Sequence, residues 1–256
     1  MKSLKTLKNI FLLFLLFLPI SSYSQKHKKK KFANSPLSFE IPKSIQWRSI
    51  GPYRGGRASS VSGVINQPNI FPGATIAVFG TGGVGLNSIL GASLINASKI
   101  IAVDILDNKL EFSYKFGATH TVNSKAENAT KKILEITNGL GVDFGFDTFG
   151  SQITTDQMMS SVRKGGTGVI IGLAPEGQTA NINMVDMVRN HKTLVGSYYG
   201  SVSPHLTFER IIEFYQSGKL DINSVIARKY PLDKINEAYD DLAKGEDGRG
   251  VIDFTL

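Results

Sequence analysis

The sequence predicts an α/β fold with a doubly wound parallel sheet over residues 72–256. Short apolar, β-branched runs such as 75–79 alternate with segments of helical spacing along this whole region. Hydrophobic residues make up 41% and charged residues 20%, as in globular proteins. Strands that alternate with helices form parallel sheets because right-handed crossover helices cover both faces.

The first strand is expected over 75–79, an apolar run typical of a strand buried on both faces. Residues 80–85 read GTGGVG and match G-x-G-x-x-G, and an apolar helix is expected over 86–94. A second buried strand over 100–103 ends at Asp104, nineteen residues after the last glycine. This order and spacing predict a Rossmann-type dinucleotide-binding unit, and the alternative is a glycine-rich turn without a ligand.

Each residue of that motif has a chemical reason. Gly80 permits the tight turn, Gly82 lets the backbone approach a pyrophosphate, and Gly85 lets the helix pack closely on the strand. The helix N-terminus offers free N–H groups and a positive dipole end to phosphates. Asp104 can accept hydrogen bonds from ribose hydroxyls and would repel a 2′-phosphate, so the sequence predicts NAD rather than NADP as cofactor.

The remaining elements follow in alternation. We expect a helix that Asp107 opens and Gly117 closes, then a strand over 119–122, and then a capping box at Ser124–Glu127 before a helix that Gly139 ends. Further strands are expected over 142–148, 168–173, 194–198, 225–230 and 250–254. Further helices are expected over 152–162, 208–218 and 235–242, the last with Asp233 as its N-cap.

The front of the chain differs from this body. Residues 1–24 read as a secretory signal, with lysines at 2, 5 and 8, an apolar stretch over 10–20 that is too short to span a bilayer, and small residues before Gln25. Export to the periplasm or the medium is expected, and an uncleaved anchor or a cytoplasmic protein is the alternative. Residues 25–71 form a basic tail and a segment without a core of its own, in which 61–64 alternates like a strand.

Charge and cysteine content exclude several functions. The net charge is +8, but residues 1–31 carry eight lysines and no acid, whereas 72–256 carry 17 basic and 20 acidic residues. The body therefore lacks the basic face of a nucleic-acid binder. The chain has no cysteine, which excludes disulfides, thiolate metal sites and a cysteine nucleophile.

Several stretches together resemble the cofactor-binding, C-terminal half of zinc-type medium-chain alcohol dehydrogenases over residues 72–254. They are PGATIAVFGTGGVG, IIAVDILDNKLEFSYKFGATH, GVDFGFDTFG, GGTGVIIGLAP and SGKLDIN with YPLDKINEAYDDLAKGEDGRGVI. The resemblance implies an NAD-dependent oxidoreductase of alcohols and aldehydes that forms a homodimer. Residues 40–71, with GPYRGGR, resemble instead the start of secreted BNR-repeat, sortilin-like β-propeller proteins.

The resemblance also implies roles for individual residues. The pyrophosphate would be held by Gly80, Gly82, Gly83, Val84 and Gly85, and also by Arg249. The adenosine ribose would be bound by Asp104 and Lys109, and the adenine would lie against Phe149. The nicotinamide would contact Ile171, Gly172 and Leu173.

In the same family, zinc is held in the N-terminal half by cysteine and histidine. This chain offers four scattered histidines and no cysteine, so we expect neither a metal site nor a catalytic residue. An NAD-binding domain that does not oxidise alcohols alone is therefore predicted, with a partner chain as one source of the missing catalytic half. An exported scaffold or interaction protein and a dimerisation module are the alternatives, and whether the chain is an enzyme stays open.

Overall fold

The computed structural model describes residues 59–201, 204–221, 223–244 and 249–255. The expected signal sequence, the basic tail and the GPYRGGR turn lie outside these residues. Within the described ranges, no helix combines the length and the apolar character needed to cross a membrane.

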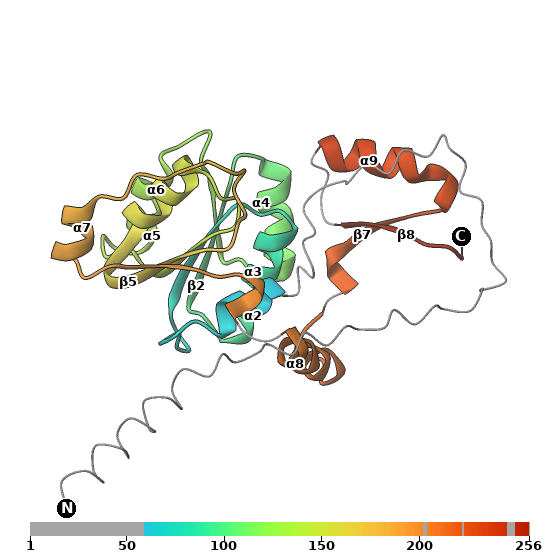
Figure 1. Ribbon diagram of the computed structural model, residues 1–256, viewed down its shortest axis with the longest axis horizontal. Coiled ribbons are helices and arrows are strands. Elements are labelled where there is room, and N and C mark those ends of the chain that lie inside the picture. The colour runs from blue at the N-terminus through green and yellow to red at the C-terminus, as the bar shows by residue number, and fades with distance from the viewer. Residues whose placement is uncertain (1–58, 202–203, 222, 245–248, 256) are drawn as a thin grey trace, which may run out of the picture. The chain divides into compact units, whose positions relative to one another are not determined.

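Six parallel strands form the central sheet in the order β3-β2-β1-β4-β5-β6 (Figure 1). They are β1 (Thr75–Phe79), β2 (Lys99–Asp104), β3 (His120–Asn123), β4 (Val142–Asp147), β5 (Val162–Ile170) and β6 (Thr193–Gly196). The predicted doubly wound parallel sheet is thereby confirmed. The strand order changes direction between β1 and β4, and in such sheets a crevice opens there beyond the carboxyl ends of the strands.

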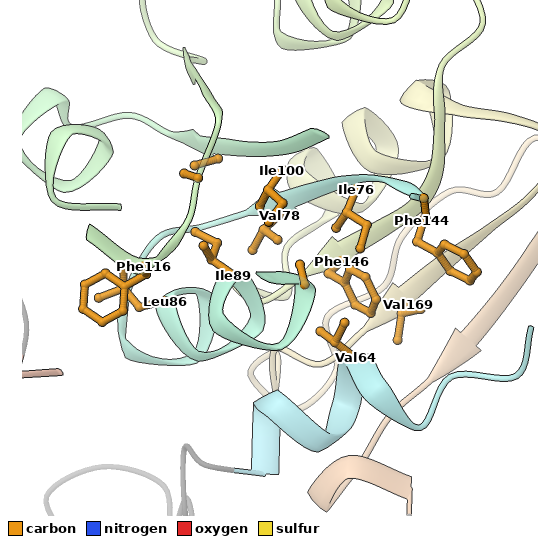
Figure 2. Close-up of a cluster of buried hydrophobic side chains, with 14 of the residues drawn as sticks. Val64, Ile76, Val78, Leu86, Ile89, Ile100, Phe116, Phe144, Phe146 and Val169 are labelled. Carbon is orange, nitrogen blue, oxygen red and sulfur yellow. The ribbon is translucent and has the colours of Figure 1, made fainter. Parts of the chain in front are cut away.

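Helices cover both faces of the sheet. They are α3 (Gly83–Leu94), α4 (Asp107–Ser113), α5 (Ala129–Ile136), α6 (Gln152–Ser161) and α7 (Met184–Arg189). Val78 packs with Leu86 of α3 in one buried cluster (Figure 2), while the next residue, Phe79, packs with Ile133 and Met158 on the opposite face. Successive strand residues point to opposite faces, so a strand covered on both sides reads as a continuous apolar run.

The expected strand over 61–64 is wrong, because Ser59–Ile65 form a helix, α2. Val61 and Val64 are both fully buried, and their i, i+3 spacing places them on one helical face. Val64 joins the cluster under α3, and a Cβ on Gly91 of α3 would lie 2.9 Å from the carbonyl oxygen of Val61. The glycine therefore allows α2 to pack closely on α3.

Other boundaries also differ. The capping box at Ser124–Glu127 is absent, and α5 is instead capped by Asn128, whose side chain accepts from the Lys131 amide. Strand β5 begins at Val162 rather than 168. Asp233 lies inside a 3₁₀ turn, Leu232–Lys234, rather than at the N-cap of the next helix.

The C-terminal part adds α8 (Pro204–Gln216), β7 (Ile226–Tyr230), α9 (Ile235–Lys244) and β8 (Arg249–Ile252). β7 and β8 pair in parallel as a separate two-stranded sheet. Ile211 of α8 and Leu220 are buried with Val61 of α2.

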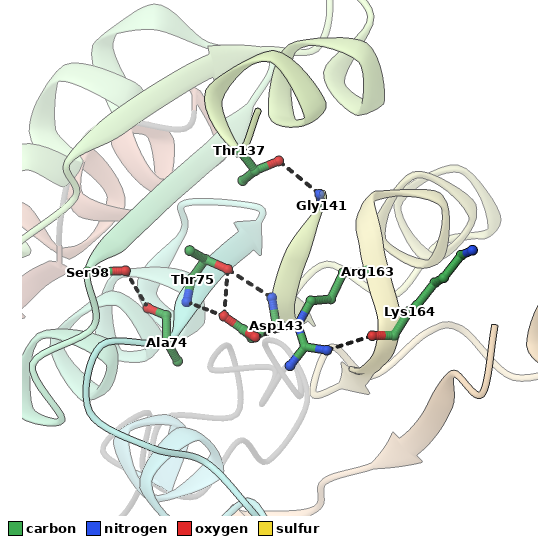
Figure 3. A network of polar contacts seen from close by, with 8 residues as sticks. All are labelled: Ala74, Thr75, Ser98, Thr137, Gly141, Asp143, Arg163 and Lys164. Carbon is green, nitrogen blue, oxygen red and sulfur yellow. Dashed lines mark hydrogen bonds and ion pairs between the residues drawn. The ribbon is translucent and has the colours of Figure 1, made fainter. Parts of the chain in front are cut away.

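A polar network joins the amino ends of β1, β4 and β5 (Figure 3). The amide and the hydroxyl of Thr75 both donate to Oδ2 of Asp143, each at 2.7 Å, and the Arg163 guanidinium pairs with Oδ1. Burial raises the pKa of Asp143, but the hydrogen bonds from Thr75 and Arg163 and the Arg163 charge outweigh it and lower the pKa below 3.8. The polar side chains of Thr75, Asp143 and Arg163 therefore satisfy one another at this end of the sheet.

Candidate functional site

The turn that follows β1 depends on glycine at two positions. Gly80 has a φ of +90°, which side chains rarely tolerate, and its amide donates to the Val103 carbonyl at 2.7 Å. A Cβ on Gly85 would lie 1.8 Å from the Gly80 carbonyl oxygen. The turn and the start of α3 can therefore meet only where both residues lack a side chain.

A cavity of about 290 Å³ opens at the carboxyl ends of β1, β2 and β4, beside this turn. It is lined by Phe79, Gly80, Gly82, Gly83, Val84, Gly85, Val103, Asp104, Ile105, Leu106, Lys109, Ser124, Thr148, Phe149, Thr154 and Gln157.

Most of the site residues expected from the sequence meet in this cavity. They are Gly80, Gly82, Gly83, Val84, Gly85, Asp104, Lys109 and Phe149. Ile171, Gly172 and Leu173 are not among its lining residues, and the Arg249 side chain lies outside the described part of the chain. The amides of Ile171 and Gly172 instead donate to the Asp147 carbonyl at 2.8 and 2.9 Å.

Asp104 ends β2 at the cavity, and its carboxylate is bonded by the chain itself. Oδ2 accepts from the Thr81 amide at 2.7 Å and from the Thr81 hydroxyl at 2.9 Å. Oδ1 accepts from the amides of Ile105 and Leu106 at 2.8 and 3.2 Å. These contacts hold the carboxylate between the glycine turn and the entrance to α4.

Positive potential faces the same cavity from two sources. The first N–H groups of α3 have no partner inside the helix, and the N-cap residue Gly82 has no side chain with which to cap them. Lys109 on α4 adds a full charge. Together they form an environment that favours a phosphate group.

The wall that carries Phe149 is held by a buried carboxylate. Asp147, at the end of β4, is 0% exposed and accepts from the amides of Phe149 and Gly150 at 3.1 and 2.9 Å. The hydroxyls of Thr154 and Thr155 donate to its other oxygen at 3.0 and 2.7 Å. Phe149 itself is 66% exposed, so it lies at the rim of the cavity.

Sequence reasoning missed Thr81, Asp147 and the lining residues from α6. One signal was available: Asp147, like Asp104, is an acidic residue that directly ends a buried apolar strand. Thr154 and Gln157 gave none, because lining the cavity depends on how α6 packs beside β4.

The chain matches the family model described as zinc-binding dehydrogenase over residues 83–217. The putative alcohol dehydrogenase D of Mycobacterium tuberculosis is 34% identical over 193 residues, which cover 73% of this chain and 52% of that protein. The NDMA-dependent alcohol dehydrogenase of Amycolatopsis methanolica is 38% identical over 184 residues, which cover 70% of this chain and 49% of that protein.

The solved structure of benzyl alcohol dehydrogenase from Acinetobacter calcoaceticus superposes with a TM-score of 0.73 at 31% identity, covering 81% of this chain and 59% of that chain. The chain thus spans about half the length of the curated relatives it matches. The family match covers α3, most of the residues that line the cavity, and the strands β2 to β6. The chain therefore belongs to the zinc-binding dehydrogenase family, of which it contains the α/β cofactor-domain portion.

Proposed function

We propose that the cavity binds NAD(H) and that this chain is the cofactor-binding part of an alcohol dehydrogenase-like oxidoreductase. Members of its family bind a dinucleotide cofactor. The chain's own contribution is to hold and orient that cofactor, and the bound nicotinamide would supply hydride transfer.

Gly82 is the observation that carries this proposal. Its backbone, with φ −70° and ψ −171°, is open to any residue, and a Cβ there would meet nothing within 4 Å. Neither backbone conformation nor packing therefore requires glycine at this position. The open space lies in front of the α3 N-terminus, where a pyrophosphate must approach the backbone closely.

Asp104 supports NAD rather than NADP. It lines the cavity beside Ile105 and Leu106, at the position where an acidic residue accepts from the adenosine ribose. A 2′-phosphate placed there would meet a carboxylate of like charge, and only Lys109 offers a compensating cation among the lining residues.

Zinc does not fit the residues that the structure describes. The sequence contains no cysteine, and the described ranges contain no group of three or more histidine or acidic residues placed to hold a metal ion. We therefore propose that alcohol oxidation requires a substrate-binding half that these residues do not supply.

Titration of the full chain with NADH, followed by nicotinamide fluorescence and calorimetry, tests the proposal. We expect saturable binding that Gly82→Val weakens at least about tenfold, because the branched side chain fills the approach to the pyrophosphate. Gly196→Val is the matched control: a Cβ there also meets nothing within 4 Å, but it lies on β6 away from the cavity. Absence of NADH binding by the folded wild type would overturn the proposal and leave a scaffold function.

A further inference from the structure

The Asp104 carboxylate is saturated before any ligand arrives. Its oxygens accept four hydrogen bonds, two from Thr81 and one each from the amides of Ile105 and Leu106. A carboxylate offers about four lone-pair sites. A ribose hydroxyl that donates to Asp104 must therefore displace or share one of these donors.

The four donors are not equally replaceable. Three are backbone amides, fixed by the glycine turn and by the chain that leads into α4. The fourth is the Thr81 hydroxyl, the one side-chain donor on this carboxylate among the described residues. Because this hydroxyl belongs to a side chain, a substitution can remove it without removing a backbone donor.

Thr81 is placed behind the carboxylate rather than in the site. Thr81 is 1% exposed and is not among the residues that line the cavity, whereas Asp104 is. The hydroxyl therefore competes for Asp104 without offering a compensating contact to a ligand.

We propose that Thr81 is a specificity-determining residue of the dinucleotide site, whose hydroxyl narrows the preference for NAD(H) over NADP(H) by occupying an acceptor position on Asp104. This inference rests on the proposed function. The bond weakens what Asp104 can offer a 2′-hydroxyl, and it draws charge from the carboxylate that would repel a 2′-phosphate. Both effects reduce the discrimination between the two cofactors.

The same chemistry occurs a second time in the molecule, which provides a matched control. The Thr75 amide and hydroxyl donate to one oxygen of Asp143 just as those of Thr81 donate to one oxygen of Asp104. Asp143 lies at the amino ends of the strands, opposite the cavity, where it pairs with Arg163, and it does not line the cavity. Thr75→Val removes an equivalent bond far from the site.

The experiment measures the ratio of the dissociation constants for NADPH and NADH in the full chain. Thr81→Val keeps the side-chain volume and the amide but removes the hydroxyl, and we expect the ratio to rise about three- to tenfold, through tighter NADH binding and weaker NADPH binding. Thr81→Ser retains a hydroxyl and should leave the ratio within about twofold of wild type. Thr75→Val should leave it unchanged, and Thr81→Val should have no effect on the ratio when Asp104 is already Asn.

The outcomes separate the two proposals. If the wild type binds NADH and the ratio stays constant or falls in Thr81→Val, the inference on Thr81 is overturned and the cofactor site stands. If neither the folded wild type nor Thr81→Val binds NADH, the proposed function fails and this inference with it. Thr81→Ala, which also lacks the hydroxyl, replaces Thr81→Val in the measurement if the valine variant does not fold by circular dichroism.

Discussion

The two ends of strand β1 contain the same local arrangement and differ in what surrounds it. At the amino end, Thr75 donates twice to Asp143, and Arg163 completes the network (Figure 3). At the carboxyl end, Thr81 donates twice to Asp104, but that carboxylate lines a cavity beside a helix N-terminus. A threonine–aspartate pair joins strands at both ends, and the accessible space decides which end can bind a ligand.

The largest effect expected at the carboxyl end of β1 comes from substituting Gly85, with Gly82 as the comparison. Gly85→Ala places a Cβ 1.8 Å from a backbone oxygen, so we expect the free energy of unfolding to fall by at least about 1–3 kcal/mol. Urea unfolding followed by circular dichroism measures it. Gly82→Ala, whose Cβ meets nothing, should stay within about 0.5 kcal/mol of wild type. Equal losses in both variants would contradict the distinction between a packing glycine and a ligand glycine.

Removal of the carboxylate at the amino end should cost stability alone. Asp143→Ala leaves the Thr75 amide, the Thr75 hydroxyl and the Nε–H of Arg163 without their acceptor, which we expect to cost about 1–3 kcal/mol. NADH affinity should not change. Lys132→Ala, which breaks half-exposed ion pairs with Glu127 and Glu135, is the control and should cost less than about 0.5 kcal/mol. A large change in NADH affinity in Asp143→Ala would show that the two ends are coupled.

A smaller effect is expected when only the hydroxyl at this end is removed. Thr75→Val takes away one donor to Asp143 and the acceptor of the Asp143 amide, and we expect a loss of about 1 kcal/mol in unfolding free energy. Thermal unfolding with and without saturating NADH gives both stability and ligand stabilisation. The increase in melting temperature that NADH produces should equal the increase in the wild type. A smaller increase would mean that the Thr75–Asp143 hydrogen bonds support the cofactor site.

The smallest expected effect is a change in the free energy of unfolding at acid pH. The pKa of Asp143 is lowered below 3.8 in the folded chain, so its contribution to stability is present above that pH and is lost as the pH falls through the folded pKa. Asp143→Asn cannot titrate there. We expect the difference in unfolding free energy between wild type and Asp143→Asn to shrink between about pH 4.5 and pH 3. A difference that grows in that window would reverse the assigned direction of the pKa shift.

Much of the fold followed from local pattern, because buried parallel strands and a glycine turn leave strong signals in sequence. The order from Thr75 to Asp104 was predicted in full and confirmed. The expectation failed at residues 61–64, which fit both the alternation of a strand and the i, i+3 spacing of a helix. These residues form the helix α2 because Val64 packs in the buried cluster with residues of α3. The early start of β5 depends on a register shift against β4, which no local pattern encodes.

Some residues of the candidate site could be predicted from the sequence, and others could not. Residues within one βαβ unit, such as Gly82 and Asp104, could be assigned because their spacing is local. Thr81 lies in the same unit but could not be assigned, because the glycine motif accepts any residue at that position and the hydrogen bond from its hydroxyl to Asp104 depends on side-chain geometry. Gln157 reaches the cavity only through the packing of α6, which is a property of the whole sheet.

The hydrogen bonds between Thr75 and Asp143 can form only after a delay during synthesis of the chain. The two residues lie 68 positions apart, and β1 can pair with β4 only after both have been made. At about 5–20 residues per second, translation of that interval takes about 3–14 s. β2 follows β1 closely and can cover one edge early, but the other edge of β1 stays open until β4 emerges from the ribosome. For those seconds, the central strand of the finished sheet is an edge strand of the nascent chain, open to chaperones and to other unfinished copies.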